Sequence, residues 1–283
     1  MPMALRAKEP KSKDARLKLF MYGDAGAGKT SASCVLPAPY IIDTEQGTNN
    51  YSELINKAGG AVFQTTSMKE IIEEVRQLRK EKHDFKTLVI DSSTPAYFGL
   101  IEECEEKVGS EFGRHYGEAN KVMRRLINLL MDLDMNVVFT AHSKVVYGDD
   151  MKKMGTTFDG WKRLDYIFDL VLELRKITPT NRKAKVVKTR LDGFPDGDVF
   201  DWTFDALSER HAIVEMERET IAIKVATEKQ LEQIRKIADN IHEGATFVSG
   251  CVKKARVDVL EDMPYDKADK MIEAMKKKIG AIE

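Results

Sequence analysis

The octapeptide Gly23–Thr30, GDAGAGKT, constrains the fold of this chain more than any other feature, because it matches the pattern G-x-x-x-x-G-K-[ST]. A short apolar run, Leu17–Tyr22, precedes it and reads as a buried strand, and a short helix is predicted over Lys29–Val35. A glycine-rich loop between a strand and a helix presents backbone N–H groups and a helix N-terminus to an anion. The sequence therefore predicts an α/β fold that holds the phosphates of a nucleotide.

Apolar strands and amphipathic helices alternate through the next hundred residues or so. This alternation predicts a mostly parallel central sheet with helices on both faces. The expected strands are Tyr40–Asp43, Ala61–Gln64, Lys86–Asp91 and Asn136–His142, and the expected helices cover residues 68–82 and 119–134.

The pattern changes after His142. The polar, glycine-containing stretch Lys144–Lys162 reads as a loop, Tyr166–Leu174 and Ala184–Thr189 read as strands, and helical spacing dominates from Thr227, a candidate N-cap. We therefore expect three parts: a flexible lead-in (1–16), an α/β core (17–225) and a small helical module (226–283).

Composition excludes several classes of protein. The 45 basic and 46 acidic residues give a net charge of -1, so any nucleic-acid surface must be local. No apolar run is long enough to cross a membrane, and the polar N-terminus does not resemble a signal peptide. The cysteines Cys34, Cys104 and Cys251 lack the paired spacing of metal ligands and suit a reducing cytoplasm.

The glycine-rich loop has a defined chemistry. Its backbone would wrap the phosphates, the Lys29 ammonium would reach the β- and γ-phosphates of ATP, and the Thr30 hydroxyl would bind Mg²⁺. Asp91, at the end of an apolar strand, is the expected acidic partner of the metal. The predicted nucleotide-binding residues are Gly23, Asp24, Ala25, Gly26, Ala27, Gly28, Lys29, Thr30 and Ser31.

A carboxylate is also needed to polarise the attacking water. Many proteins with this loop carry it directly after the metal-binding Asp, but Ser92 occupies that position here and cannot act as a base. Glu45, just beyond the strand that follows the loop helix, is the best-placed candidate if its strand neighbours the one that ends at Asp91.

The run Leu19–Gly47 resembles the RecA-like ATPases of phages, and more narrowly the Sak-type single-strand annealing or recombination proteins. The resemblance rests on the phosphate loop, the very short helix, the Leu36-Pro37-x-Pro39 element and the string IIDTEQG, and it covers about residues 17–225. It implies a RecA-like core that binds ATP and Mg²⁺ and hydrolyses ATP in response to single-stranded DNA. It further implies a head-to-tail ring or filament in the bacterial host cytoplasm, with a single-strand-binding protein as a further partner.

The resemblance also implies roles for three residues outside the loop. His142 would sense the γ-phosphate, in the place where RecA itself commonly has a glutamine. Lys188 and Arg190 resemble the basic strand-end pair that such assemblies insert into a neighbour's ATP site, where they would neutralise developing charge.

Two segments, Ser93–Gly117 and Lys144–Lys162, correspond to the DNA-binding loops of RecA-like proteins. Cations there could pair with phosphates and aromatic rings could stack on bases, although Asp149, Asp150 and Asp159 dilute the charge. The candidate DNA-binding residues are Lys144, Lys152, Lys153, Trp161, Lys162 and Arg163. The lysine-rich helical module could gather DNA or bind a partner protein.

Other functions are compatible with the same loop. A hexameric RecA-like helicase or replication motor would share the ATP site, but usually carries an additional N-terminal domain. A P-loop phosphotransferase needs an acceptor pocket and commonly an arginine-rich lid. A P-loop switch would regulate by binding, and Glu45 argues for turnover instead.

Overall fold

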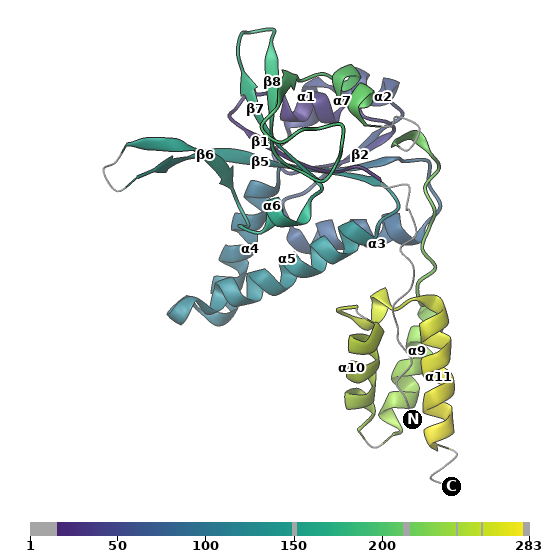
Figure 1. Cartoon of the computed structure of the whole chain (residues 1–283). Coiled ribbons are helices and arrows are strands. Elements are labelled where there is room, and N and C mark those ends of the chain that lie inside the picture. Colours follow the sequence, from purple (N-terminus) through teal and green to yellow (C-terminus); the bar gives the residue numbers. More distant parts are fainter. Residues whose placement is uncertain (1–15, 149–151, 212–215, 242, 256, 280–283) are drawn as a thin grey trace, which may run out of the picture.

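The computed structural model describes residues 16–148, 152–211, 216–241, 243–255 and 257–279. A nine-stranded sheet forms its centre, with the order β3-β2-β4-β5-β1-β7-β8-β9 and with β6 paired to β5 (Figure 1). The pairs among β1 to β5 and β7 are parallel, whereas β6, β8 and β9 join antiparallel. The strands are β1 (Lys18–Gly23), β2 (Pro39–Asp43), β3 (Ala61–Gln64), β4 (Thr87–Asp91), β5 (Asn136–Tyr147), β6 (Lys153–Asp159), β7 (Leu170–Lys176), β8 (Arg182–Thr189) and β9 (Val199–Asp201). The predicted mostly parallel α/β sheet is confirmed.

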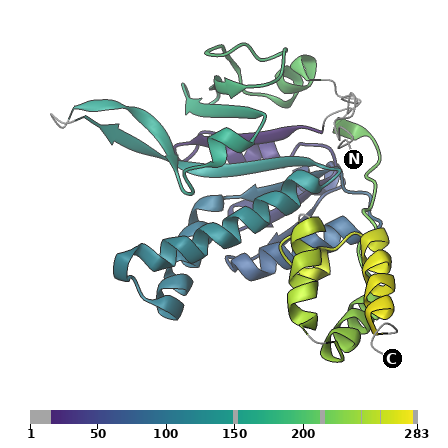
Figure 2. The ribbon, with the colours of Figure 1, turned by 60° about the horizontal axis from the view of Figure 1, so that its bottom comes forward.

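Helices cover both faces of the sheet (Figures 1 and 2). One face packs against the amphipathic helices α3 (Met68–Lys80), α4 (Ser93–Val108) and α5 (Arg114–Asp132), together with the short α6 (Leu164–Ile167). The other face packs against α1 (Lys29–Ser33), α2 (Ser52–Lys57) and α7 (Phe204–Arg210). Each layer buries its own apolar cluster, so the strands between them are apolar on both sides, as parallel strands require.

The register of the sheet brings the ends of several strands to one edge. Asp43 of β2 lies opposite Asp91 of β4, and Gly23 of β1 lies opposite His142 of β5. Because parallel strands share a carboxyl edge, the phosphate loop after β1 and the acids after β2 and β4 meet there. The neighbouring strands that the assignment of Glu45 required are present.

The prediction of a loop over Lys144–Lys162 is wrong. β5 continues past His142 to Tyr147 and pairs antiparallel with β6, and the two strands extend beyond the body of the sheet (Figure 1). We call the pair Ser143–Gly148 and Lys152–Asp159 the β-arm. The β-branched and aromatic residues Val145, Val146 and Tyr147 favour a strand, and all three are exposed there. Residues 149–151, including Asp149 and Asp150, lie outside the described part of the chain.

Two further segments differ from prediction. Ser93–Gly117, expected as a DNA-binding loop, is helical: α4 fills most of it, followed by the 3-10 turn η2 (Glu111–Gly113) and the start of α5. The strand expected from Tyr166 begins at Leu170, because residues 164–167 form the short helix α6.

The C-terminal helices α9 (Glu228–Asp239), α10 (Gly244–Ala255) and α11 (Tyr265–Ile279) bury a third apolar cluster among themselves. Thr227 caps α9 through a capping box with Gln230, as its sequence position suggested. This helical module joins the core through Arg76 of α3, which makes two hydrogen bonds of 2.9 and 3.0 Å to the buried Asp262. None of the helices in the described part of the chain is long and apolar enough to span a membrane.

Candidate nucleotide site at the carboxyl edge of the sheet

The loop between β1 and α1 has the close-packed backbone expected of a phosphate cradle. Gly23 lies against β7, where a Cβ atom would come within 2.4 Å of the Leu174 carbonyl oxygen. Gly28 has a φ of 96°, in the left-handed region that glycine occupies without strain, and it is the N-cap of α1. Residues Gly23–Gly26 and Gly28–Ser31 line a cavity of about 510 Å³, whereas the side chain of Ala27 is buried beneath it.

Lys29 folds back onto this loop. Its ammonium donates to the carbonyl oxygens of Gly23 at 2.6 Å and Asp24 at 3.1 Å. Burial lowers the pKa of Lys29, while the nearby acids, Asp91 first among them, act in the opposite direction. The ammonium therefore stands at the mouth of the cradle with acceptors that phosphate oxygens could replace.

Asp91 is buried at the end of β4 and faces the start of α1. Its Oδ1 accepts a hydrogen bond of 2.5 Å from Thr140, and the Thr30 hydroxyl is hydrogen-bonded to the same carboxylate. Burial raises the pKa of Asp91, and the hydrogen bonds from Thr140 and Thr30 oppose this. A hydroxyl and a carboxylate that converge in this way suit Mg²⁺, which prefers oxygen ligands and takes the others from phosphate and water. No cluster of three His, Cys, Asp or Glu side chains that could hold a metal unaided occurs among the described residues.

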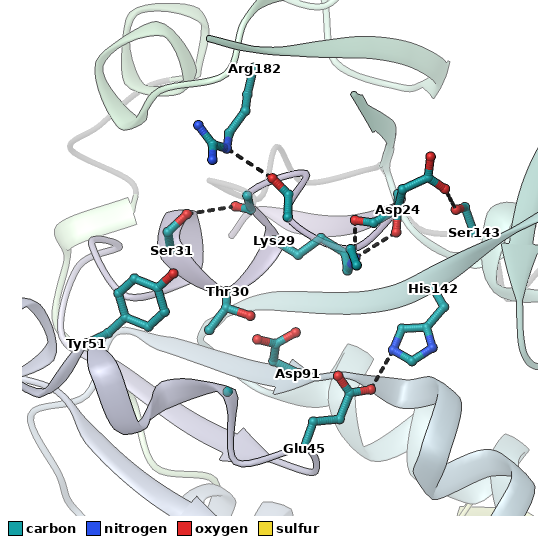
Figure 3. A pocket seen from close by; sticks show the side chains of 15 residues that line it. Asp24, Lys29, Thr30, Ser31, Glu45, Tyr51, Asp91, His142, Ser143 and Arg182 are labelled. Carbon is teal, nitrogen blue, oxygen red and sulfur yellow. Dashed lines mark hydrogen bonds and ion pairs between the residues drawn. The ribbon is translucent and has the colours of Figure 1, made fainter. Parts of the chain in front are cut away.

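Glu45 points toward the same cavity (Figure 3). Its Oε1 lies 2.5 Å from Nε2 of His142 and accepts a hydrogen bond of 2.9 Å from the Ser92 hydroxyl. Thr44 ties the backbone beside it to the neighbouring strand, since its hydroxyl donates to the Ser92 carbonyl and accepts from the Ser92 N–H. Three elements thus hold one carboxylate, on the side of the cavity where Lys29 and Asp91 lie.

Asp43 organises the turn that carries Glu45. Its carboxylate accepts hydrogen bonds from the backbone N–H groups of Glu45, Gly47 and Thr48, and from the Thr48 hydroxyl. Burial opposes ionisation of Asp43, but these hydrogen bonds outweigh it and lower its pKa. The turn is therefore built around a charged carboxylate, and the 3-10 helix η1 (Gly47–Asn50) continues from it.

The structure adds Tyr51, Ser143 and Arg182 to the cavity, none of which the sequence predicted as part of it. Ser143 makes a hydrogen bond to Asp24 and so connects the β-arm to the phosphate loop. Arg182, at the start of β8, lies over the loop and donates from Nε to the Gly26 carbonyl oxygen at 3.2 Å. Arg182 is more than 150 residues from the loop, and no local pattern marks it.

Lys188 and Arg190 do not reach this cavity within one subunit. β8 runs antiparallel to β7, so Thr189 pairs with Leu170 at the opposite edge of the sheet from the phosphate loop. The Lys188 ammonium donates to the Phe168 carbonyl oxygen, and Arg190 pairs with Asp169 at 3.0 Å. Their predicted action on a neighbour's site stays a prediction.

The predicted DNA-binding residues fall into two groups. Trp161 was expected to contact DNA, but it is only 4% exposed and its indole N–H donates to Asn120. Its ring is therefore not available to stack on a base. The ring packs in the apolar layer that covers one face of the sheet. The neighbouring Lys162 had suggested an exposed segment instead. The exposed cations are Lys144, Lys152 and Lys153 on the β-arm, with Lys144 paired to Asp159, and Lys162 and Arg163 before α6.

Comparison with known proteins gives one family for this chain. The family model described as "AAA domain" matches residues 15–193, which include the phosphate loop, Glu45, Asp91, His142 and Arg182. The match covers well over half of the chain and the whole of the edge at which these residues meet. No curated protein matches the sequence. A P-loop framed by Asp91 and Glu45, matched over this span, places the chain in the AAA domain family of P-loop ATPases.

Proposed function

We propose that this protein hydrolyses ATP with Mg²⁺ and acts on single-stranded DNA, in annealing or recombination, in the manner of the Sak-type RecA-like proteins that its sequence resembles. The observation that carries the hydrolytic part is the position of Glu45. Its carboxylate faces the cavity from a turn of its own, held by Ser92 and His142, on the side where Lys29 and Asp91 lie.

Each group has a defined part in the reaction. The loop N–H groups and the Lys29 ammonium bind oxygens of the β- and γ-phosphates, and the ammonium offsets part of their negative charge. Thr30 and Asp91 would hold Mg²⁺, directly or through water, and the ion would offset further negative charge. Glu45 accepts a hydrogen bond from the attacking water and orients it. His142 of β5 contacts Glu45, so loss of the γ-phosphate that moves Glu45 would also move the end of β5 at the cavity.

The continuity of β5 supports the DNA-binding part. The same strand that carries His142 and Ser143 at the cavity runs on into the β-arm, which bears the exposed cations Lys144, Lys152 and Lys153. Cations and an exposed aromatic residue such as Tyr147 are groups that bind the backbone and bases of a single strand. Head-to-tail assembly would place Lys188 and Arg190 of one subunit at the ATP of the next.

The test is ATP hydrolysis measured with and without single-stranded DNA, at two salt concentrations, with Lys29→Ala as the blank. We expect turnover that single strands stimulate and that salt weakens, because phosphate contacts release counterions. Duplex DNA of the same sequence is the matched control. Turnover that ignores DNA would refute the DNA-dependent reading and would favour a phosphotransferase or a switch, whereas normal turnover by Lys29→Ala would overturn the ATP site itself.

A further inference from the structure

Arg182 occupies a fixed position over the phosphate loop. Besides the bond from Nε to Gly26, its Nη1 donates to the Pro179 carbonyl oxygen at 3.2 Å. Its aliphatic stem lies so close to Gly28 that a Cβ atom there would come within 2.7 Å of the Arg182 Cδ. Trp202 of the same sheet edge reinforces this contact, since its indole N–H donates to the Gly28 carbonyl oxygen at 3.4 Å. The β8–β9 edge therefore clamps the outer side of the loop.

The position of Arg182 differs from that of the other charged residues of the cavity. Lys29, Asp91 and Glu45 lie on one side of the loop, and Arg182 lies on the other, in the region that Ser31 and Tyr51 also border (Figure 3). The terminal phosphate belongs with the first group, where the cation and the water-orienting carboxylate are. A nucleotide is an extended molecule, so one bound with its terminal phosphate there would direct its sugar and base toward the second group.

We propose that Arg182 binds the nucleoside end of the nucleotide in its own subunit, with the flat guanidinium against the base. This inference rests on the proposed ATP site and adds a residue to it. Two carbonyl oxygens fix the plane of the guanidinium, so little conformational freedom is lost when a base packs on it. Nη2 has no hydrogen-bond partner within the described part of the chain and remains available to the ligand.

The experiment compares ADP with inorganic tripolyphosphate, both with Mg²⁺, by titration calorimetry on the full chain. Tripolyphosphate carries the phosphates but no base, so a contact to the base affects ADP alone. Arg182→Ala should weaken ADP binding about fivefold to tenfold, in line with a guanidinium–ring contact, and leave tripolyphosphate within about twofold. Arg182→Lys keeps the charge and the stem on Gly28 but lacks the flat face, so it should lose nearly as much affinity for ADP.

Lys183→Ala is the matched control. Lys183 is the next residue on β8, so its side chain points to the other face, where it pairs with Asp201 at 2.9 Å. It should bind both ligands like the parent chain. If Arg182→Ala fails to fold, as judged by thermal unfolding without ligand, Arg182→Lys carries the comparison.

The outcomes separate this inference from the proposed function. Equal losses for ADP and tripolyphosphate, with recovery in Arg182→Lys, would mean that Arg182 pairs with phosphate and would overturn the inference alone. Parent-like binding of ADP by the Arg182 variants would overturn it as well. A parent chain that binds neither ligand would overturn the inference together with the ATP site.

Discussion

Asp43 offers the sharpest test of how the turn positions Glu45, because one buried carboxylate accepts four hydrogen bonds. In Asp43→Ala, the N–H groups of Glu45 and Gly47 can turn to water, since both residues are exposed. The N–H and hydroxyl of Thr48 cannot, since Thr48 is 3% exposed. Two buried donors left without acceptors cost about 1–2 kcal/mol each, so we expect a loss of about 3 kcal/mol in the free energy of unfolding.

Urea unfolding of the ligand-free protein measures this loss. Asp43→Asn keeps one acceptor oxygen and should lose less, about 1–2 kcal/mol, and the isosteric Thr48→Val should lose about 1 kcal/mol. Glu103→Ala, which breaks the exposed pair with Lys107, is the surface control and should change stability by under about 1 kcal/mol.

Asp43→Asn should also reduce ATP turnover while it leaves nucleotide affinity nearly unchanged. A displaced Glu45 no longer orients water, so kcat of Asp43→Asn should fall about 10- to 100-fold while ADP affinity stays within about threefold. If Asp43→Ala were to unfold at the parent urea concentration, or if kcat of Asp43→Asn matched the parent, then the hydrogen bonds of Asp43 would not be what holds the turn.

Three further predictions follow from other contacts. Glu45→Gln should bind ATP like the parent but hydrolyse it about 10²- to 10⁴-fold more slowly, measured by calorimetry and phosphate release; parent-like turnover would place the catalytic acid elsewhere. Arg76→Ala should lower the free energy of unfolding by about 3 kcal/mol, because it leaves the buried Asp262 carboxylate unpaired, whereas Lys107→Ala at an exposed pair should stay within about 0.5 kcal/mol. Because the folded pKa of Asp43 is lowered, its contribution to stability should be complete above the pKa of the unfolded chain and lost as the pH falls through the folded value; urea midpoints of the parent should therefore fall more steeply with acid than those of Asp43→Asn.

The sequence sufficed for the parts of the site that depend on strand ends. The phosphate loop is local, and parallel pairing brings whatever follows β2 and β4 to the same edge, so the meeting of Lys29, Asp91 and Glu45 could be expected. Arg182 could not, because the start of an antiparallel strand on the far side of β7 carries no local sign of which loop it will cover.

The β-arm could not be predicted from the sequence for a related reason. The segment Lys144–Lys162 as a whole is rich in polar residues and glycine and shows no period, which hides the short run Val145–Tyr147. The pairing of its strands is stabilised by the partner strand rather than by a buried face. The prediction for Trp161 was wrong because its neighbour Lys162 suggested an exposed segment, whereas the fold of the chain buries the ring.

The unbroken course of β5 makes the β-arm a lever. From His142 to Tyr147 the strand advances about 17 Å, so a tilt of about 10° at the cavity would carry the end of the strand about 3 Å. Antiparallel pairing with β6 stiffens this part of β5. The hydrogen bond between Ser143 and Asp24 lies at its base, next to the phosphate loop. A shift of a fraction of an ångström at the phosphates would thus move Tyr147 by about the length of a hydrogen bond.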